Sequence, residues 1–75
     1  MEAYANRSGD SSVDGFECGP DWIRVRFTDG AVYMYDAAKP GAGAVQRMQA
    51  YARAGTGLSS YINRSVGKNY ARREG

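Results

Sequence analysis

One short segment of the chain places a tryptophan and two arginines at alternate positions. Trp22, Arg24 and Arg26 alternate with apolar residues within residues 22–27. This period of two is typical of a half-buried strand, so the three side chains share one face. An indole and two guanidinium groups on one face can stack on nucleic-acid bases and contact phosphates. The same residue types also serve as anchors in protein interfaces, or the arginines simply solvate the sheet.

Basic residues are concentrated in the second half of the sequence. Residues 1–36 hold three arginines against seven acids, whereas residues 37–75 hold seven basic residues against Glu74 alone. Such an asymmetry can attract polyanions, although it is also compatible with an ordinary solvated surface. Arg64, Lys68 and Arg72 align on one side if the last helix continues beyond residue 67. The residues predicted to bind nucleic acid or a partner are Trp22, Arg24, Arg26, Met34, Arg64, Lys68, Arg72 and Arg73.

The residue types needed for most catalytic and metal sites are scarce in this chain. It contains no histidine and a single cysteine, Cys18, which we interpret as a small buried or half-buried hydrophobe. Nucleophile systems that depend on histidine and structural zinc sites are therefore excluded. Ser59 and Ser60 lack a base and are better interpreted as helix caps. We predict a non-enzymatic protein with no catalytic residue, no metal and no cofactor.

The length and composition indicate one small globular domain. The chain has 75 residues, of which 43% are hydrophobic and 12% aromatic, enough for one modest core. No apolar run approaches the roughly 20 residues that a membrane span needs, and residues 1–10 lack the apolar stretch of a secretory signal. We predict a cytoplasmic protein that does not contact membranes and binds either RNA or a protein, as an adaptor or a phage-encoded inhibitor of a host complex.

The chain predicts an α+β fold, a three-stranded antiparallel β-meander followed by two short helices packed on one face. Alternation and turn residues indicate the strands, and a stripe of apolar residues at helical spacing indicates the first helix. The expected strands cover residues 13–18, 22–28 and 31–36, and the expected helices cover residues 42–54 and 60–66. The domain is expected over residues 11–71, after a flexible lead-in (1–10) and before a basic tail (72–75).

The hairpin at Asp29-Gly30 leaves two strand registers open. A two-residue loop places Tyr33 and Tyr35 on the face away from the core, opposite the two arginines. A three-residue loop that includes Thr28 turns both tyrosines toward the core and Met34 outward. A one-residue slip reverses every side chain, so the loop decides which residues form the binding face.

Several short motifs, in this order and spacing, resemble the KTSC domain, a small family named for the C-terminal extension of some lysyl-tRNA synthetases. The matching pieces are Gly15-Phe16-Glu17, Ile23-Arg24-Val25-Arg26-Phe27, Asp29-Gly30, Tyr33-Met34-Tyr35, Pro40, Tyr61-Ile62-Asn63-Arg64-Ser65-Val66 and Tyr70. The resemblance covers roughly residues 11–71. The chain departs from the family pattern at Lys39 and in the small residues that open the first helix.

The resemblance has implications for both register and function. The middle residue of the family's Tyr-x-Tyr motif is often polar, which favours the three-residue loop with Met34 outward. The motif residues would then be mainly structural, and they are Tyr33, Tyr35, Tyr61, Asn63 and Tyr70. The synthetase context of the family favours RNA as the partner, by association alone.

Overall fold

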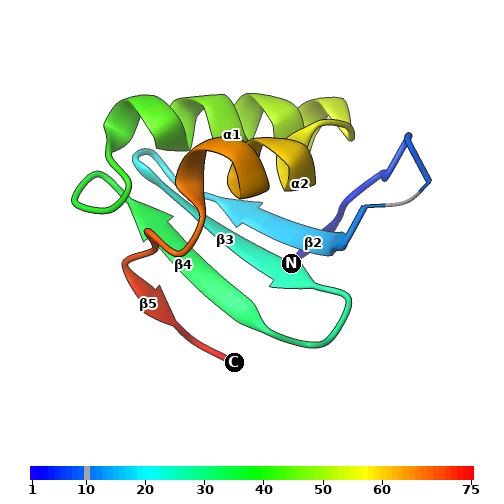
Figure 1. Cartoon of the computed structure of the whole chain (residues 1–75), viewed down its shortest axis with the longest axis horizontal. Coiled ribbons are helices and arrows are strands. Elements are labelled where there is room, and N and C mark those ends of the chain that lie inside the picture. The colour runs from blue at the N-terminus through cyan, green and yellow to red at the C-terminus, as the bar shows by residue number, and fades with distance from the viewer. Residues whose placement is uncertain (10) are drawn as a thin grey trace.

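A single antiparallel sheet with helices on one face forms the fold (Figure 1). The computed structural model describes residues 1–9 and 11–75; residue 10, the last of the predicted lead-in, lies outside the described residues. The strands follow one another across the sheet in the order β1-β2-β3-β4-β5. Their bounds are β1 Glu2–Ala3, β2 Val13–Cys18, β3 Trp22–Phe27, β4 Val32–Asp36 and β5 Arg72–Arg73. The predicted α+β class with an antiparallel sheet and two helices is confirmed.

The predicted number of three strands is wrong, because a short strand is added at each edge of the meander. β1 pairs with β2 through Glu2 and Ala3, and β5 pairs with β4 through Arg72 and Arg73. Both come from segments that we assigned to the lead-in and the tail. Strands of two residues carry no alternation, so no sequence pattern predicts them.

The first helix, α1 (Ala42–Ala54), has the predicted bounds. It ends at Gly55, whose φ of 77° is the left-handed conformation that favours glycine. The next helix, α2 (Leu58–Tyr61), continues directly into the π-helical segment η1 (Ile62–Val66). Ser59 and Ser60 lie inside α2 and do not cap it, because the N-cap position is Gly57.

The last helix does not extend past Gly67, which corrects one of our predictions. Gly67 has a φ of 57°, and the chain then leaves the helix and returns to the edge of the sheet as β5. Lys68 therefore lies in a turn and Arg72 in a strand. With Arg64 on η1, the three cations do not align on one helical face.

The three-residue hairpin loop is the one observed. Val25 pairs with Tyr33 and Ile23 with Tyr35, and the backbone N–H of Phe27 donates to the carbonyl of Ala31. The Asp29 carboxylate accepts a hydrogen bond from the Ala31 backbone N–H, which fixes the turn. Both tyrosines consequently face the helices.

The core lies between the sheet and the helices. Ile23, Val25 and Tyr35 from the sheet meet Met48 and Leu58 from the helices, and all five are at most 1% exposed. The remaining buried apolar members of this cluster are Tyr4, Val13, Phe16, Val45, Ala52, Tyr61, Ile62 and Val66. None of the helices in the described residues is long and apolar enough to cross a membrane.

Two side chains differ in burial from what the sequence predicts. The alternation in residues 22–27 predicts Phe27 in the core, on the same face as Ile23 and Val25. It is only half-buried at the end of β3 and packs against the edge of the cluster. Tyr4, within the predicted lead-in, is 6% exposed, and its hydroxyl accepts a hydrogen bond from the Leu58 backbone N–H at 3.3 Å.

Candidate functional site

The face of the sheet away from the helices holds five of the predicted binding residues. Strand pairing places Arg24 beside Met34, and Met34 beside Arg72. Trp22 and Arg26 lie on the same face, as the alternation predicted. We call this surface, formed by Trp22, Arg24, Arg26, Met34 and Arg72, the open face.

The arginines of the open face are already paired with carboxylates. Arg24 donates to Glu17 at 2.6 Å and also to Glu74, and Arg26 donates to Asp14 at 2.7 Å. The hydrogen bonds to Glu74 and then to Glu17 raise the pKa of Arg24. These ion pairs neutralise much of the positive charge that the sequence placed on this face.

The Trp22 side chain also contacts other residues of the domain. The Arg24 guanidinium carbon lies 5.0 Å from the centre of the Trp22 ring, a cation–π distance. A Cβ built on Gly19 would come within 2.0 Å of the indole Nε1, so the ring lies directly against the glycine backbone. The indole therefore packs over the β2–β3 turn and is only half-exposed.

From the sequence we did not identify the three acids that pair with the arginines of the open face, Asp14, Glu17 and Glu74. Glu17 lies directly opposite Arg24 in the β2–β3 pair, and a cross-strand charge pair is a usual feature of such positions. The exposed acids of residues 13–18 were the signal that could have revealed this. Glu74 could not be predicted in this way, because it lies 50 residues from Arg24 in the sequence.

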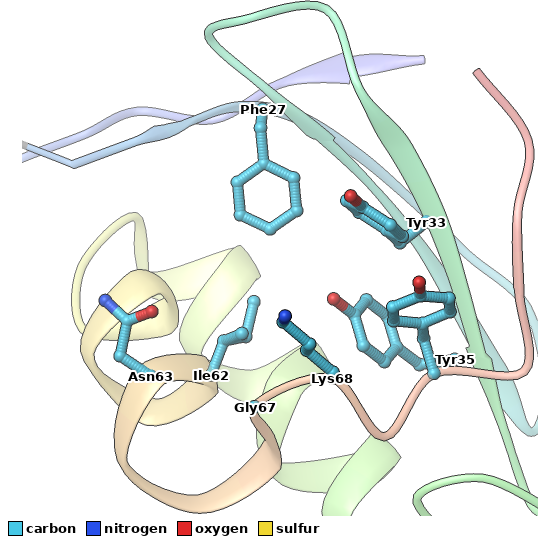
Figure 2. A pocket seen from close by; sticks show the side chains of 8 residues that line it. Phe27, Tyr33, Tyr35, Ile62, Asn63, Gly67 and Lys68 are labelled. Atoms are coloured by element: carbon cyan, nitrogen blue, oxygen red, sulfur yellow. The ribbon is translucent and has the colours of Figure 1, made fainter.

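A cavity of about 330 Å³ opens on the helix side of the sheet, at the end where η1 meets β4. Figure 2 shows the Lys68 amino group pointing into the space bounded by Phe27, Tyr33 and Tyr35. We call this cavity the tyrosine pocket; its lining residues are Phe27, Tyr33, Tyr35, Ile62, Asn63, Gly67, Lys68 and Tyr70. Four of the five predicted structural motif residues therefore form its wall.

The aromatic rings of the tyrosine pocket contact one another closely. The Tyr33 ring lies 4.5 Å from that of Tyr70 and 5.6 Å from that of Phe27, between ring centres. Tyr35 meets Tyr70 edge-on at 6.4 Å. Tyr61, the remaining motif residue, lies outside the pocket and packs against Tyr51 at 5.3 Å.

Two cations border the tyrosine pocket. Lys68 is part of the lining, and the Arg73 guanidinium carbon lies 5.7 Å from the centre of the Tyr33 ring. Within residues 1–9 and 11–75, the ion pairs use Arg24, Arg26 and Arg72, and none uses Lys68 or Arg73. The described lining contains no acidic residue. The pocket therefore carries positive charge that no acid of its described lining offsets, whereas the arginines of the open face are paired with acids.

The tyrosine pocket includes one hydroxyl group, that of Tyr35, whose pKa is raised well above neutral pH. Burial, followed by the neighbouring hydroxyls of Tyr33 and Tyr70, raises the pKa of Tyr35 to about 12. A neutral phenol both donates and accepts hydrogen bonds. With rings, hydroxyls, the Asn63 amide and an ammonium group, the pocket can hold a flat polar molecule that carries negative charge.

The other chemistry-bearing groups are dispersed. No cluster of three or more potential metal ligands occurs in the part of the chain that the structure describes. Burial raises the pKa of the half-buried Cys18 thiol, which fits its interpretation as a small hydrophobe. Arg64 is exposed on η1 and does not line the tyrosine pocket.

Comparison with known proteins adds no relative to this description. No family model, curated protein or solved structure matches the chain.

Proposed function

We propose that this protein is a small non-enzymatic nucleic-acid-binding domain that takes one unpaired nucleotide of a single strand into the tyrosine pocket. The observation that carries the proposal is the combination of aromatic lining, two adjacent cations and the lack of an acid among the described lining residues. Single-stranded RNA is recognised in this way, through bases that are unstacked and inserted among aromatic side chains.

The base is held by stacking and by hydrogen bonds. Tyr33, Tyr70 and Phe27 offer ring faces and edges, and contact with aromatic rings contributes about 1–3 kcal/mol per base. The Tyr35 hydroxyl and the Asn63 amide supply donors and acceptors for the edge of the base.

The adjoining phosphates are bound by Lys68 and Arg73. A cation without a competing carboxylate can contact phosphate without first breaking an ion pair. Lys68 meets this condition among the described residues, and Arg73 donates to the Gly75 backbone oxygen at 2.7 Å, whereas Arg24 and Arg26 are paired with carboxylates. We therefore place nucleic-acid binding at the tyrosine pocket rather than on the open face that the sequence favoured.

Two expectations from the sequence stay predictions within this proposal: the resemblance to the KTSC domain and the cytoplasmic location. A protein partner is the competing function, and it would use Trp22 and Met34 on the open face, where the neutralised charge suits a protein interface.

The test is fluorescence anisotropy with labelled single-stranded RNA and an RNA hairpin, at two salt concentrations. Lys68→Gln should weaken binding by about three- to tenfold and lower the salt slope by about 0.7, as expected for one lost phosphate contact. Arg47→Gln is the matched control, because it removes the same charge from an exposed site on α1 outside the pocket lining.

Two results would contradict the proposal. One is an absence of RNA binding at low salt, which would leave the protein-partner function ahead. The other is an equal loss for Lys68→Gln and Arg47→Gln, which would indicate attraction by overall charge alone.

A further inference from the structure

One wall of the tyrosine pocket is formed by the last segment of the chain, which follows η1. Residues 67–75, which we call the strap, run from the end of η1 to the edge of the sheet (Figure 1). Gly67, Lys68 and Tyr70 of the strap line the pocket, and Arg73 lies over the Tyr33 ring. The position of the strap therefore determines the shape and the charge of the pocket.

Among the described residues, backbone hydrogen bonds attach the strap to η1 where it begins and to β4 further along. The Ala71 N–H donates to the Met34 carbonyl at 2.8 Å, and the Glu74 N–H donates to the Val32 carbonyl at 2.7 Å. The strand within the strap, β5, has two residues and lies at an edge of the sheet. Short edge strands open readily, so the strap depends on further contacts.

On the helix side the Tyr70 ring contacts Tyr33 and Tyr35, and the charged contacts of the strap lie on the opposite face of the sheet. Glu74 accepts hydrogen bonds from Arg24 and, at 2.8 Å, from Arg72, and Arg24 also donates to Glu17. The Glu74 side chain is 23% exposed, the least exposed member of this chain of charges. The hydrogen bond from Arg24 and then that from Arg72 lower the pKa of Glu74, so it is ionised at neutral pH.

We infer that Arg24 and Glu74 are positioning residues for the tyrosine pocket, which they shape by fastening the strap from the open face. This inference rests on the proposed function for its ligand. Arg24 is then not a phosphate contact, although its type and exposure in the sequence predicted one. Its guanidinium group joins β2, β3 and the strap through two carboxylates.

The two roles of Arg24 make opposite predictions for Glu74→Gln. If Arg24 contacts phosphate, removal of Glu74 frees a cation and deletes a negative charge, so RNA binding strengthens. If Arg24 fastens the strap, the same substitution loosens the pocket wall, so RNA binding weakens. Asp14→Asn is the matched control, because it breaks the Arg26 ion pair on the same face without touching the strap.

RNA anisotropy gives the first measurement. We expect Glu74→Gln and Arg24→Gln each to weaken binding by about three- to tenfold, the loss of one charge-assisted contact. The double variant should be no weaker than the single ones, because both remove the same interaction. Asp14→Asn should stay within about twofold of the unaltered protein. Stronger binding by Glu74→Gln, or an equal loss for Asp14→Asn, would overturn the inference.

Amide hydrogen exchange without RNA gives the second measurement, which separates this inference from the proposed function. In Glu74→Gln the Ala71 amide should exchange about three- to tenfold faster, while the Val25 amide in β3 should keep its rate. Unchanged exchange at Ala71, or an equal increase at Val25, would overturn the inference even if RNA binds. If no RNA binds but Ala71 exchange rises alone, the fastening role stands and the proposed function fails.

Discussion

The two faces of the sheet use the same residue types for different purposes. On the open face, Arg24 and Arg26 are bound to acids of neighbouring strands and link those strands together. On the helix side, Lys68 and Arg73 border an aromatic cavity, and neither forms an ion pair among the described residues. The comparison teaches that a cation indicates a binding site only when its charge is available. Alternation along a strand shows which face a side chain occupies, but not what else reaches that face.

The largest expected effect contrasts a buried residue of β3 with an arginine of the same strand that lies on the open face. Ile23 is 0% exposed between the sheet and the helices, so Ile23→Ala should lower the free energy of unfolding by about 3–4 kcal/mol. Arg26→Ala should lower it by less than about 1 kcal/mol, because its ion pair is solvent-screened. Urea unfolding of both variants checks this. Equal losses would show that the two faces are not energetically distinct.

A second prediction concerns the buried hydroxyl on the helix side. The folded-state pKa of Tyr35 is raised from 10.0 to about 12, so the unfolded chain releases this proton first as the pH rises. Its contribution is therefore complete below pH 10 and is lost between pH 10 and 12. The fall should reach about 2–3 kcal/mol. Urea unfolding at pH 9, 10 and 11 measures the first part of this fall, about 1.4 kcal/mol by pH 11, and Tyr35→Phe should flatten the decline. An equally steep decline in Tyr35→Phe would assign the effect to other groups.

A third prediction concerns Phe27, on the helix side but at the mouth of the pocket. Phe27→Ala should lower the free energy of unfolding by about 2 kcal/mol, less than full burial would give, because Phe27 is half-buried beside a cavity. The measurement is urea unfolding in parallel with Ile23→Ala. A loss as large as that of Ile23→Ala would place Phe27 in the core, as the sequence predicted.

The smallest expected effect is the coupling between Arg26 and Asp14. Both side chains are more than 40% exposed, at 42% and 44%, so a double-mutant cycle should give less than about 1 kcal/mol. The coupling should shrink further in high salt. A larger value that resists salt would mean that the open face is less hydrated than its exposure indicates.

The sequence predicted the strands and helices that are specified by patterns among residues close together in the chain. Alternation in residues 22–27 identified β3, and the apolar stripe at helical spacing identified α1 with its correct bounds. Asp29-Gly30 identified the hairpin, but the residues alone left its register open. The family resemblance favoured the three-residue loop, and the observed pairing of Val25 with Tyr33 confirms that register.

The sequence could not predict features that join distant segments. Tyr4 enters the core and Glu74 reaches Arg24 only because both edges of the sheet gain a two-residue strand. The tyrosine pocket likewise forms where β4, η1 and the strap meet. The resemblance named four of its residues, Tyr33, Tyr35, Asn63 and Tyr70, as structural ones, but their grouping around Lys68 depends on the helix ending at Gly67.

The most direct test of the account is to locate the bound strand on the protein by NMR. A single-stranded RNA oligonucleotide is titrated into isotope-labelled protein, and the shifts of both faces are compared. The account predicts the largest shifts in the side chains of Tyr33, Tyr70 and Lys68, with small shifts for the Trp22 indole and the Met34 methyl group. The largest shifts at Trp22 and Met34, with the tyrosine pocket unchanged, would contradict it.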